Sequence, residues 1–97
     1  MKTGIELIAE ERQRQIDVEG WTQEHDNAHQ NGQLANAAGC YALSPEQRYF
    51  DYERNTPYAW PWHISHWKPS PNRERDLIKA GALIAAELDR LQRLKKI

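Results

Sequence analysis

The feature that most constrains the fold is a repeat of apolar and small residues in the C-terminal third. Its members alternate steps of four and three residues, and they are Leu77, Gly81, Ile84, Leu88 and Leu91. This spacing is typical of a helix that packs one face against another helix. Glycine inside a helix costs about 1 kcal/mol relative to alanine, so Gly81 indicates a close approach of a neighbouring backbone. We expect a long helix over residues 72–94.

A second helix is expected over residues 4–19. Thr3 and Glu6 have the spacing of a capping box, in which the two side chains bind early backbone N–H groups. Apolar residues then recur at helical spacing. Gly20 follows, where helices commonly end in a left-handed residue.

Two further cap residues predict shorter helices. Asn31 is expected to cap a helix over residues 32–43. Ser44 is followed by a proline and is expected to cap a short helix over residues 45–50. With no strand pattern and no internal repeat, the fold class is all-α. We expect a small bundle of three main helices in one domain, residues 1–97.

Residues 51–71 show no convincing helical periodicity. Four prolines forbid a long helix there, namely Pro57, Pro61, Pro69 and Pro71. The segment nevertheless contains three tryptophans, which makes it too apolar for a disordered linker. We expect an ordered loop, held in place by aromatic rings, before the last long helix.

The same loop is the best candidate for a ligand site. Indole rings stack on planar bases with about 1–3 kcal/mol each, and phosphates bind helix N-termini and cationic side chains. The candidate ligand-binding residues are Trp60, Trp62, Trp67, Lys68, Arg73 and Arg75, with Arg12 and Arg14 from a paired helix. The alternative role of each tryptophan is to form the core of a small domain that has few aliphatic residues.

Two histidine pairs have spacings that zinc sites use. His25 and His29 are four residues apart with Asp26 between them, and His63 and His66 are three apart. Neither pair lies in an expected helix, so we assign no metal site and favour a loop-stabilising role for His25 and Asp26. If a metal is bound, His25, Asp26 and His29 are its candidate ligands.

The carboxylates were compared with those of small all-α nucleotide pyrophosphohydrolases, which hold magnesium with an E-x-x-E pair and a later E-x-x-D pair. Glu6, Glu10 and Glu11 lack that spacing, and Glu87 and Asp89 are only two residues apart. We therefore favour a non-enzymatic protein without catalytic residues or cofactor. The alternative, a metal-dependent nucleotide hydrolase, would use Glu10, Glu11, His25, Asp26 and His29.

Composition and charge bear on partners. Only 39% of residues are hydrophobic and 28% are charged, so we expect a second copy to complete the core, in a dimer or higher homo-oligomer. Residues 1–67 carry five Lys and Arg against ten Asp and Glu, whereas residues 68–97 carry eight against four. We favour an arrangement in which these parts face each other; the alternative is a basic face for a phosphorylated or acidic partner.

The single cysteine and the apolar runs bear on location. Cys40 can form no intramolecular disulfide and lies among small residues, as is typical of a buried thiol in a reducing compartment. No signal peptide is evident, and no apolar run approaches the roughly 20 residues of a membrane span. We expect a cytoplasmic protein without membrane contact. With a net charge of -1 and no recognition-helix signature, nucleic-acid binding is not expected.

Several motifs resemble those of a group of small phage and prophage proteins. The group has an E-R-x-R-Q helix, an E-G-W-T-x-E-H-D turn, a G-x-L-A-x-A-A helix, a W-P-W segment, a W-K-P turn and an R-D-L-x-K-A-G-A-L-I-x-A-E helix. The matching stretches here are residues 11–15, 19–26, 32–38, 60–62, 67–69 and 75–87. His63 and His66 stand where the group has acidic or aromatic residues. The resemblance covers most of the chain and implies a phage or prophage origin, in the host cytoplasm, but no particular activity.

The leading hypothesis is thus a non-enzymatic phage accessory protein. It would bind a small phosphorylated, nucleotide-like ligand or a host protein, for example by sequestering a nucleotide to counter host defence. Two alternatives stay open, namely the metal-dependent nucleotide hydrolase and a purely structural or interaction module, which an exposed apolar patch without a concave pocket would indicate.

Overall fold

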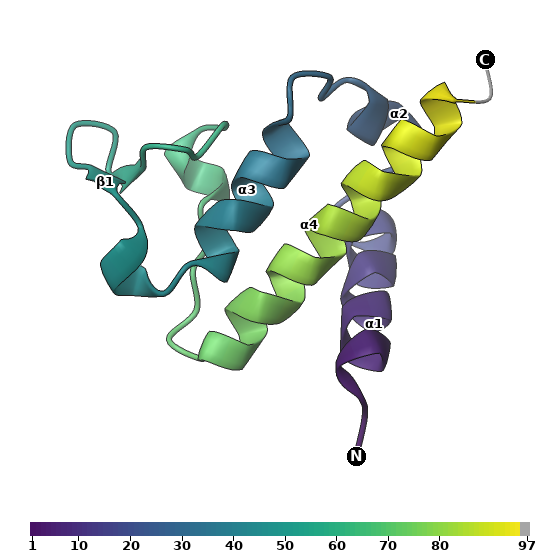
Figure 1. Ribbon diagram of the computed structural model, residues 1–97, viewed down its shortest axis with the longest axis horizontal. Helices are drawn as coiled ribbons and strands as arrows, with labels where there is room; N and C mark the ends of the chain where they lie inside the picture. Colours follow the sequence, from purple (N-terminus) through teal and green to yellow (C-terminus); the bar gives the residue numbers. More distant parts are fainter. Residues whose placement is uncertain (96–97) are drawn as a thin grey trace.

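A computed structural model describes residues 1–95 of the chain. Its elements are α1 (Gly4–Asp17), α2 (Gln23–Asn27), α3 (Gln33–Ala42), the 3-10 turn η1 (Pro45–Gln47), β1 (Phe50–Asp51), β2 (Thr56–Pro57), the 3-10 turn η2 (Ile64–His66) and α4 (Arg73–Leu94). The protein is mostly helical, and α1, α2 and α3 all pack on α4, which crosses the molecule diagonally in Figure 1. The all-α prediction is confirmed in this sense, while residues 96–97 of the expected single domain lie outside the described part.

The capping residues set the ends of the two long helices. The Thr3 hydroxyl accepts a hydrogen bond from the Glu6 backbone N–H at 3.3 Å, and the Glu6 carboxylate accepts one from the Thr3 N–H at 2.9 Å. This is the expected capping box. Asn72 caps α4 by accepting from the Glu74 N–H at 2.9 Å. Helix α1 ends at Asp17, two residues earlier than predicted, and Gly20 beyond it has the left-handed φ of 75°.

Three parts of the local prediction are wrong. Asn31 does not cap α3, because Gly32, with a left-handed φ of 79°, stands at the N-cap without a side-chain hydrogen bond. The helix expected over residues 45–50 is only the three-residue turn η1, after which the chain enters a small antiparallel hairpin that pairs Phe50 with Pro57. The segment taken as a loop before Asn31 contains the short helix α2. Its cap, Thr22, accepts from the His25 N–H at 3.5 Å. A helix of five residues depends on tertiary contacts more than on local signals.

One arginine holds the loop after the hairpin. Arg54 pairs with Asp51 at 2.9 Å and donates to the backbone carbonyls of Pro57 at 3.1 Å, Tyr58 at 2.9 Å and Trp60 at 3.1 Å. These carbonyls have no regular ladder to satisfy them, and a guanidinium offers five donors in one plane. The expected ordered loop is therefore held by a cation as well as by rings.

The core lies between α3 and α4. Its buried side chains are mostly small, namely Leu34, Ala37, Ala38, Cys40, Tyr41, Ala80, Leu83 and Ala86, with Trp60 from the loop. Alanines on both helices let the backbones approach closely, and the large rings fill the remaining space. Cys40 is buried as expected, and burial raises the pKa of its thiol.

Most of the residues that were predicted to form the packing face of α4 do not pack against another helix of the same chain. Gly81 does face α1, because a Cβ there would overlap the side chain of Ile8. By contrast, Leu77 is 47% exposed, Ile84 49%, Leu88 54% and Leu91 41%. The alanine-rich face of α4 is buried instead, since its small side chains permit closer contact with α3.

Helix length and hydropathy together determine whether a helix can cross a membrane. In residues 1–95, no helix combines the length and the apolar character that crossing a bilayer requires.

Candidate ligand-binding pocket

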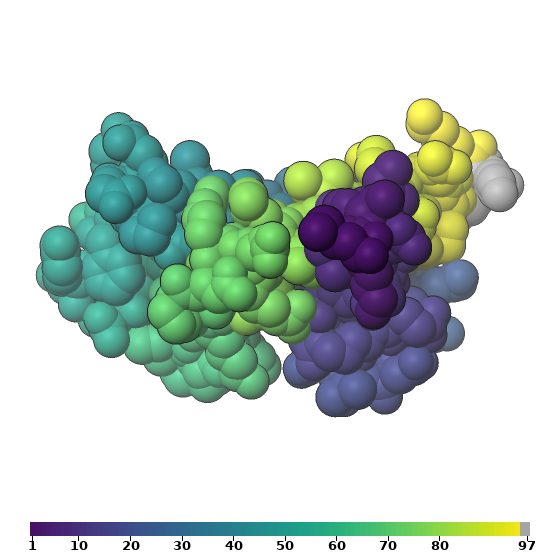
Figure 2. Space-filling model, turned by 90° about the horizontal axis from the view of Figure 1, so that it is seen from below, coloured from purple at the N-terminus to yellow at the C-terminus, as the bar shows by residue number. Residues whose placement is uncertain are grey.

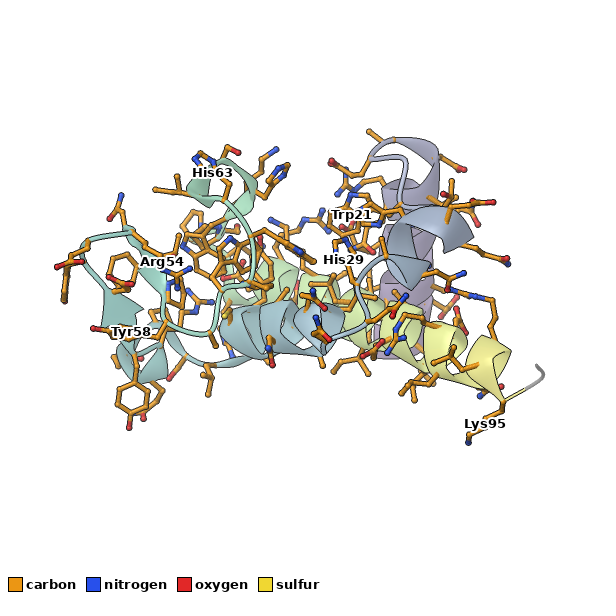
Figure 3. The ribbon with its side chains drawn as sticks, turned by 90° about the horizontal axis from the view of Figure 1, so that it is seen from above. Trp21, His29, Arg54, Tyr58, His63 and Lys95 are labelled. Carbon is orange, nitrogen blue, oxygen red and sulfur yellow. The ribbon has the colours of Figure 1, made fainter. Side chains whose placement is uncertain are left out.

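A cavity of about 330 Å³ opens between α2 and the loop that follows β2. Its lining is formed by Trp21, His25, His29, Tyr41, Trp60, Trp62, His63, His66 and Leu83. All four histidines of the chain line it, although they come from two distant segments. Figure 3 shows Trp21 and His29 on one side and His63 across from them, and Figure 2 shows the corresponding notch between the blue and green segments. The volume lies at the lower end of the range of small-molecule sites.

The aromatic rings of the cavity form a continuous chain of contacts. Trp21 stacks on His25 with ring centroids 5.4 Å apart and an interplanar angle of 2°. His25 meets His29 edge-on at 4.8 Å, and His29 meets Trp62 at 5.1 Å. Trp62 in turn lies 5.3 Å from Trp60. The walls therefore offer flat π faces rather than flexible aliphatic chains.

A buried ion pair orients the histidine at the centre of this chain. Asp26 is fully buried, and one of its oxygens accepts from Arg12 at 2.5 Å while the other lies 3.1 Å from Nδ1 of His25. A carboxylate paired with arginine only accepts hydrogen bonds, so neutral His25 carries its proton on Nδ1. Nε2 of His25 is left as an acceptor. Burial, and then the neighbouring His25, lower the pKa of His29 below its ordinary value of 6.5.

A smaller hollow of about 60 Å³ adjoins the cavity and shares Trp21, Tyr41, His66 and Leu83 with it. Its further lining is charged or polar, namely Glu11, Arg14, Gln15, Glu19, Lys68 and Lys79. The two hollows therefore form one site with an aromatic end and a charged end.

The charged end contains cations that are partly engaged. Lys79 donates to the Lys68 carbonyl at 2.6 Å and lies 5.3 Å from the Tyr41 ring centroid. Burial, and then repulsion from Arg75, lower the pKa of Lys79. Arg14 pairs with Glu11 at 2.9 Å. Its Nη1 also donates to Glu19 at 3.1 Å, so every guanidinium nitrogen of Arg14 is already bonded to a carboxylate. Lys79 keeps further donors that a ligand can meet.

Two buried polar atoms in the lining lack partners. Gln15 is 2% exposed, and its Oε1 accepts no hydrogen bond from any described residue. Nε1 of Trp62 likewise donates to none of the residues 1–95. Buried polar groups are nearly always paired, so such atoms call for a water molecule or a ligand as partner.

The structure brings only part of the predicted ligand-binding set to this site. Trp60 and Trp62 line the cavity, and Lys68 and Arg14 line the smaller hollow. Trp67 lines neither, because it packs on Tyr41 at 4.8 Å and on Trp60 at 4.9 Å.

The other three predicted cations have structural partners instead. Arg73 donates to the Tyr41 carbonyl at 3.0 Å, to the Leu43 carbonyl at 2.9 Å and to the Ala42 carbonyl, and so covers the C-terminus of α3. Arg75 pairs with Glu11 at 2.8 Å, and Arg12 is held by Asp26 as described. None of the three lines either hollow.

Sequence reasoning missed part of the lining. Trp21, Tyr41, Gln15 and Lys79 were not predicted as site residues, and the four histidines were considered as metal ligands or, for His25, as a loop-stabilising residue. The usable signal was the presence of histidine pairs beside tryptophans in both the 19–29 and the 60–67 segments. Nothing in the sequence states that these segments meet.

The carboxylates do not gather around the histidines. Within residues 1–95, no group of three or more His, Cys, Asp or Glu side chains is placed to hold a metal ion. Glu10 pairs with Lys2 at 2.7 Å on the surface, and Glu11 belongs to the charged hollow. The convergence that the hydrolase alternative requires of Glu10, Glu11, His25, Asp26 and His29 is therefore not found in the described part.

Comparisons with known proteins add no assignment. No protein-family model, no curated protein and no solved structure matches this chain. The pocket is therefore interpreted from its own residues.

Proposed function

We propose that this protein binds a small planar anion of the nucleotide type without transforming it. The observation that carries the proposal is the joint site, in which a cavity walled by aromatic rings adjoins a hollow lined by Arg14, Lys68 and Lys79. The planar group lies among the rings, and the anionic group reaches the cations.

The aromatic end suits a flat heterocycle. Base–aromatic stacking contributes about 1–3 kcal/mol per base and tolerates different bases. Trp21 and Trp62 are partly exposed, and their ring centroids lie 6.2 Å apart with an interplanar angle of 57°. They are the accessible stacking surfaces of the cavity. Trp60 is 2% exposed and serves mainly as the floor.

The polar atoms favour a ligand that donates as well as accepts. Nε2 of His25 and Oε1 of Gln15 are acceptors, and Nε1 of Trp62 is a donor. Nucleobase edges combine N–H donors with ring-nitrogen and carbonyl acceptors. A purely aromatic hydrocarbon would leave these atoms unpaired, at about 1–3 kcal/mol each.

The charged end favours a small anion. Three cations, Arg14, Lys68 and Lys79, face two carboxylates, Glu11 and Glu19, in the lining. The surplus of one positive charge matches a single phosphate or a carboxylate better than a triphosphate. In biological terms, and given the resemblance to phage proteins, sequestration of a nucleotide signal that serves host defence is the concrete version of this role.

Calorimetric titration tests the proposal, with nucleosides and with mono-, di-, tri- and cyclic nucleotides. We expect heat and tryptophan quenching with a monophosphate or cyclic nucleotide, and weaker binding of the matching nucleoside. Trp62→Phe should remove much of the quenching, whereas Trp67→Phe, outside the cavity, is the matched control. Neither heat nor quenching across the whole panel would refute the ligand-binding function.

A further inference from the structure

A row of apolar side chains on α4 has no partner within the described chain. Leu77, Ile84, Leu88 and Leu91 are each between 41% and 54% exposed. Their spacing places them on one side of the helix, and none of them lines the ligand cavity or the charged hollow. Leaving four half-exposed aliphatic side chains of one row in water is unfavourable, because exposed apolar surface costs about 25 cal/mol of free energy per Å².

We propose that this row is the contact between two copies of the chain, with their α4 helices antiparallel about Ile84. The row is symmetric about that residue, because Leu77 and Leu91 each lie seven positions away from it. A two-fold axis at Ile84 therefore sets Leu77 against the partner's Leu91 and Ile84 against the partner's Ile84. Such a self-complementary patch is what an isologous dimer requires.

Charge selects the antiparallel orientation. Glu74 lies at the start of α4 and Lys95 just after its end, and both are exposed. An antiparallel pair brings Glu74 near the partner's Lys95 and sets the two helix dipoles in opposition, which is favourable. A parallel pair would place like charges side by side at both ends.

Sedimentation equilibrium or light scattering tests the association. We expect a species of twice the 11.4 kDa chain mass, and at least tenfold weaker association after Ile84→Glu or Leu88→Glu, with the circular dichroism spectrum unchanged. Val18→Glu is the control, since Val18 is 70% exposed just after the end of α1. A monomer at high protein concentration, or a dimer that both row variants leave intact, would overturn the proposal.

Disulfide trapping tests the orientation, in a Cys40→Ala background. Ile84→Cys should cross-link to itself, because it lies on the axis. Leu77→Cys and Leu91→Cys should cross-link when mixed but not alone. Self-cross-linking of Leu77→Cys would instead show a parallel pair and refute the antiparallel arrangement.

Discussion

Loss of the buried Arg12–Asp26 pair is expected to destabilise the protein severely. Asp26 is fully buried, and the Arg12 side chain is only 13% exposed to solvent. Removing one member of such a pair costs about 3–5 kcal/mol, because the other charge stays buried without compensation. Nε and Nη1 of Arg12 already lack partners among the described residues, so Asp26→Ala leaves the guanidinium with no replacement acceptor.

The magnitude is large against the total stability of a small domain. Domains of this size unfold with about 5–15 kcal/mol, and each kcal/mol lowers the melting temperature by about 4–8 °C. We therefore expect Asp26→Ala to lower the melting temperature by more than 12 °C, on the basis of at least about 3 kcal/mol. Asp26→Asn keeps the shape and an acceptor for His25, and should cost less.

A double-mutant cycle distinguishes loss of the Arg12–Asp26 interaction from a general loss of stability. Free energies of unfolding from urea titration are compared for Arg12→Met, Asp26→Ala and the double variant. The double variant should cost little more than either single change, since each single change already strands the opposite charge. Additivity of the two costs to within about 0.5 kcal/mol would show that the residues do not act as a pair and would refute the reasoning.

Three further outcomes are expected. Gly81→Ala should cost about 1–3 kcal/mol in urea unfolding by overpacking against Ile8, and Ile8→Ala in the same chain should recover part of it; an unchanged midpoint would contradict the close contact. Arg73→Ala should cost about 1–3 kcal/mol because it strands carbonyls at the end of α3, whereas Lys2→Ala, which removes only an exposed ion pair with Glu10, should change the midpoint little. Since the pKa of His29 is lowered on folding, the unfolded chain binds more protons. The stabilisation is present above pH 6.5 and lost as the pH falls through the lower folded value, so His29→Phe should flatten the fall in stability below pH 6.5.

Helix positions were predictable because their signals are local. Thr3 and Glu6 bind backbone groups within four residues of each other, so the sequence alone reveals this capping box. Helix α2 was missed because its stability depends on Asp26 meeting Arg12, which comes from another helix. The hairpin was missed because each of its strands has only two residues, which is too short to show the alternating pattern of a strand.

The candidate site was predictable only by residue type. Trp60 and Trp62 were identified because aromatic rings clustered with prolines are rare in loops. The cations were assigned less well, because a sequence does not say whether a guanidinium will meet a carbonyl, a carboxylate or a ligand. Arg73 illustrates the limit, since it lies beside the tryptophan loop in sequence but covers the end of α3 in space.

The central position of α4 has a consequence for biosynthesis. Helices α1, α2 and α3 are made first, yet each finds its main packing surface on the helix that is translated after them. At about 5–20 residues per second, the ribosome needs several seconds to proceed from Gln33 to Leu94. During that time the alanine face of α3 lacks the helix that covers it, whereas the indoles of the loop can already pack on Tyr41 of α3. The α3–α4 core therefore forms only after α4 has been translated.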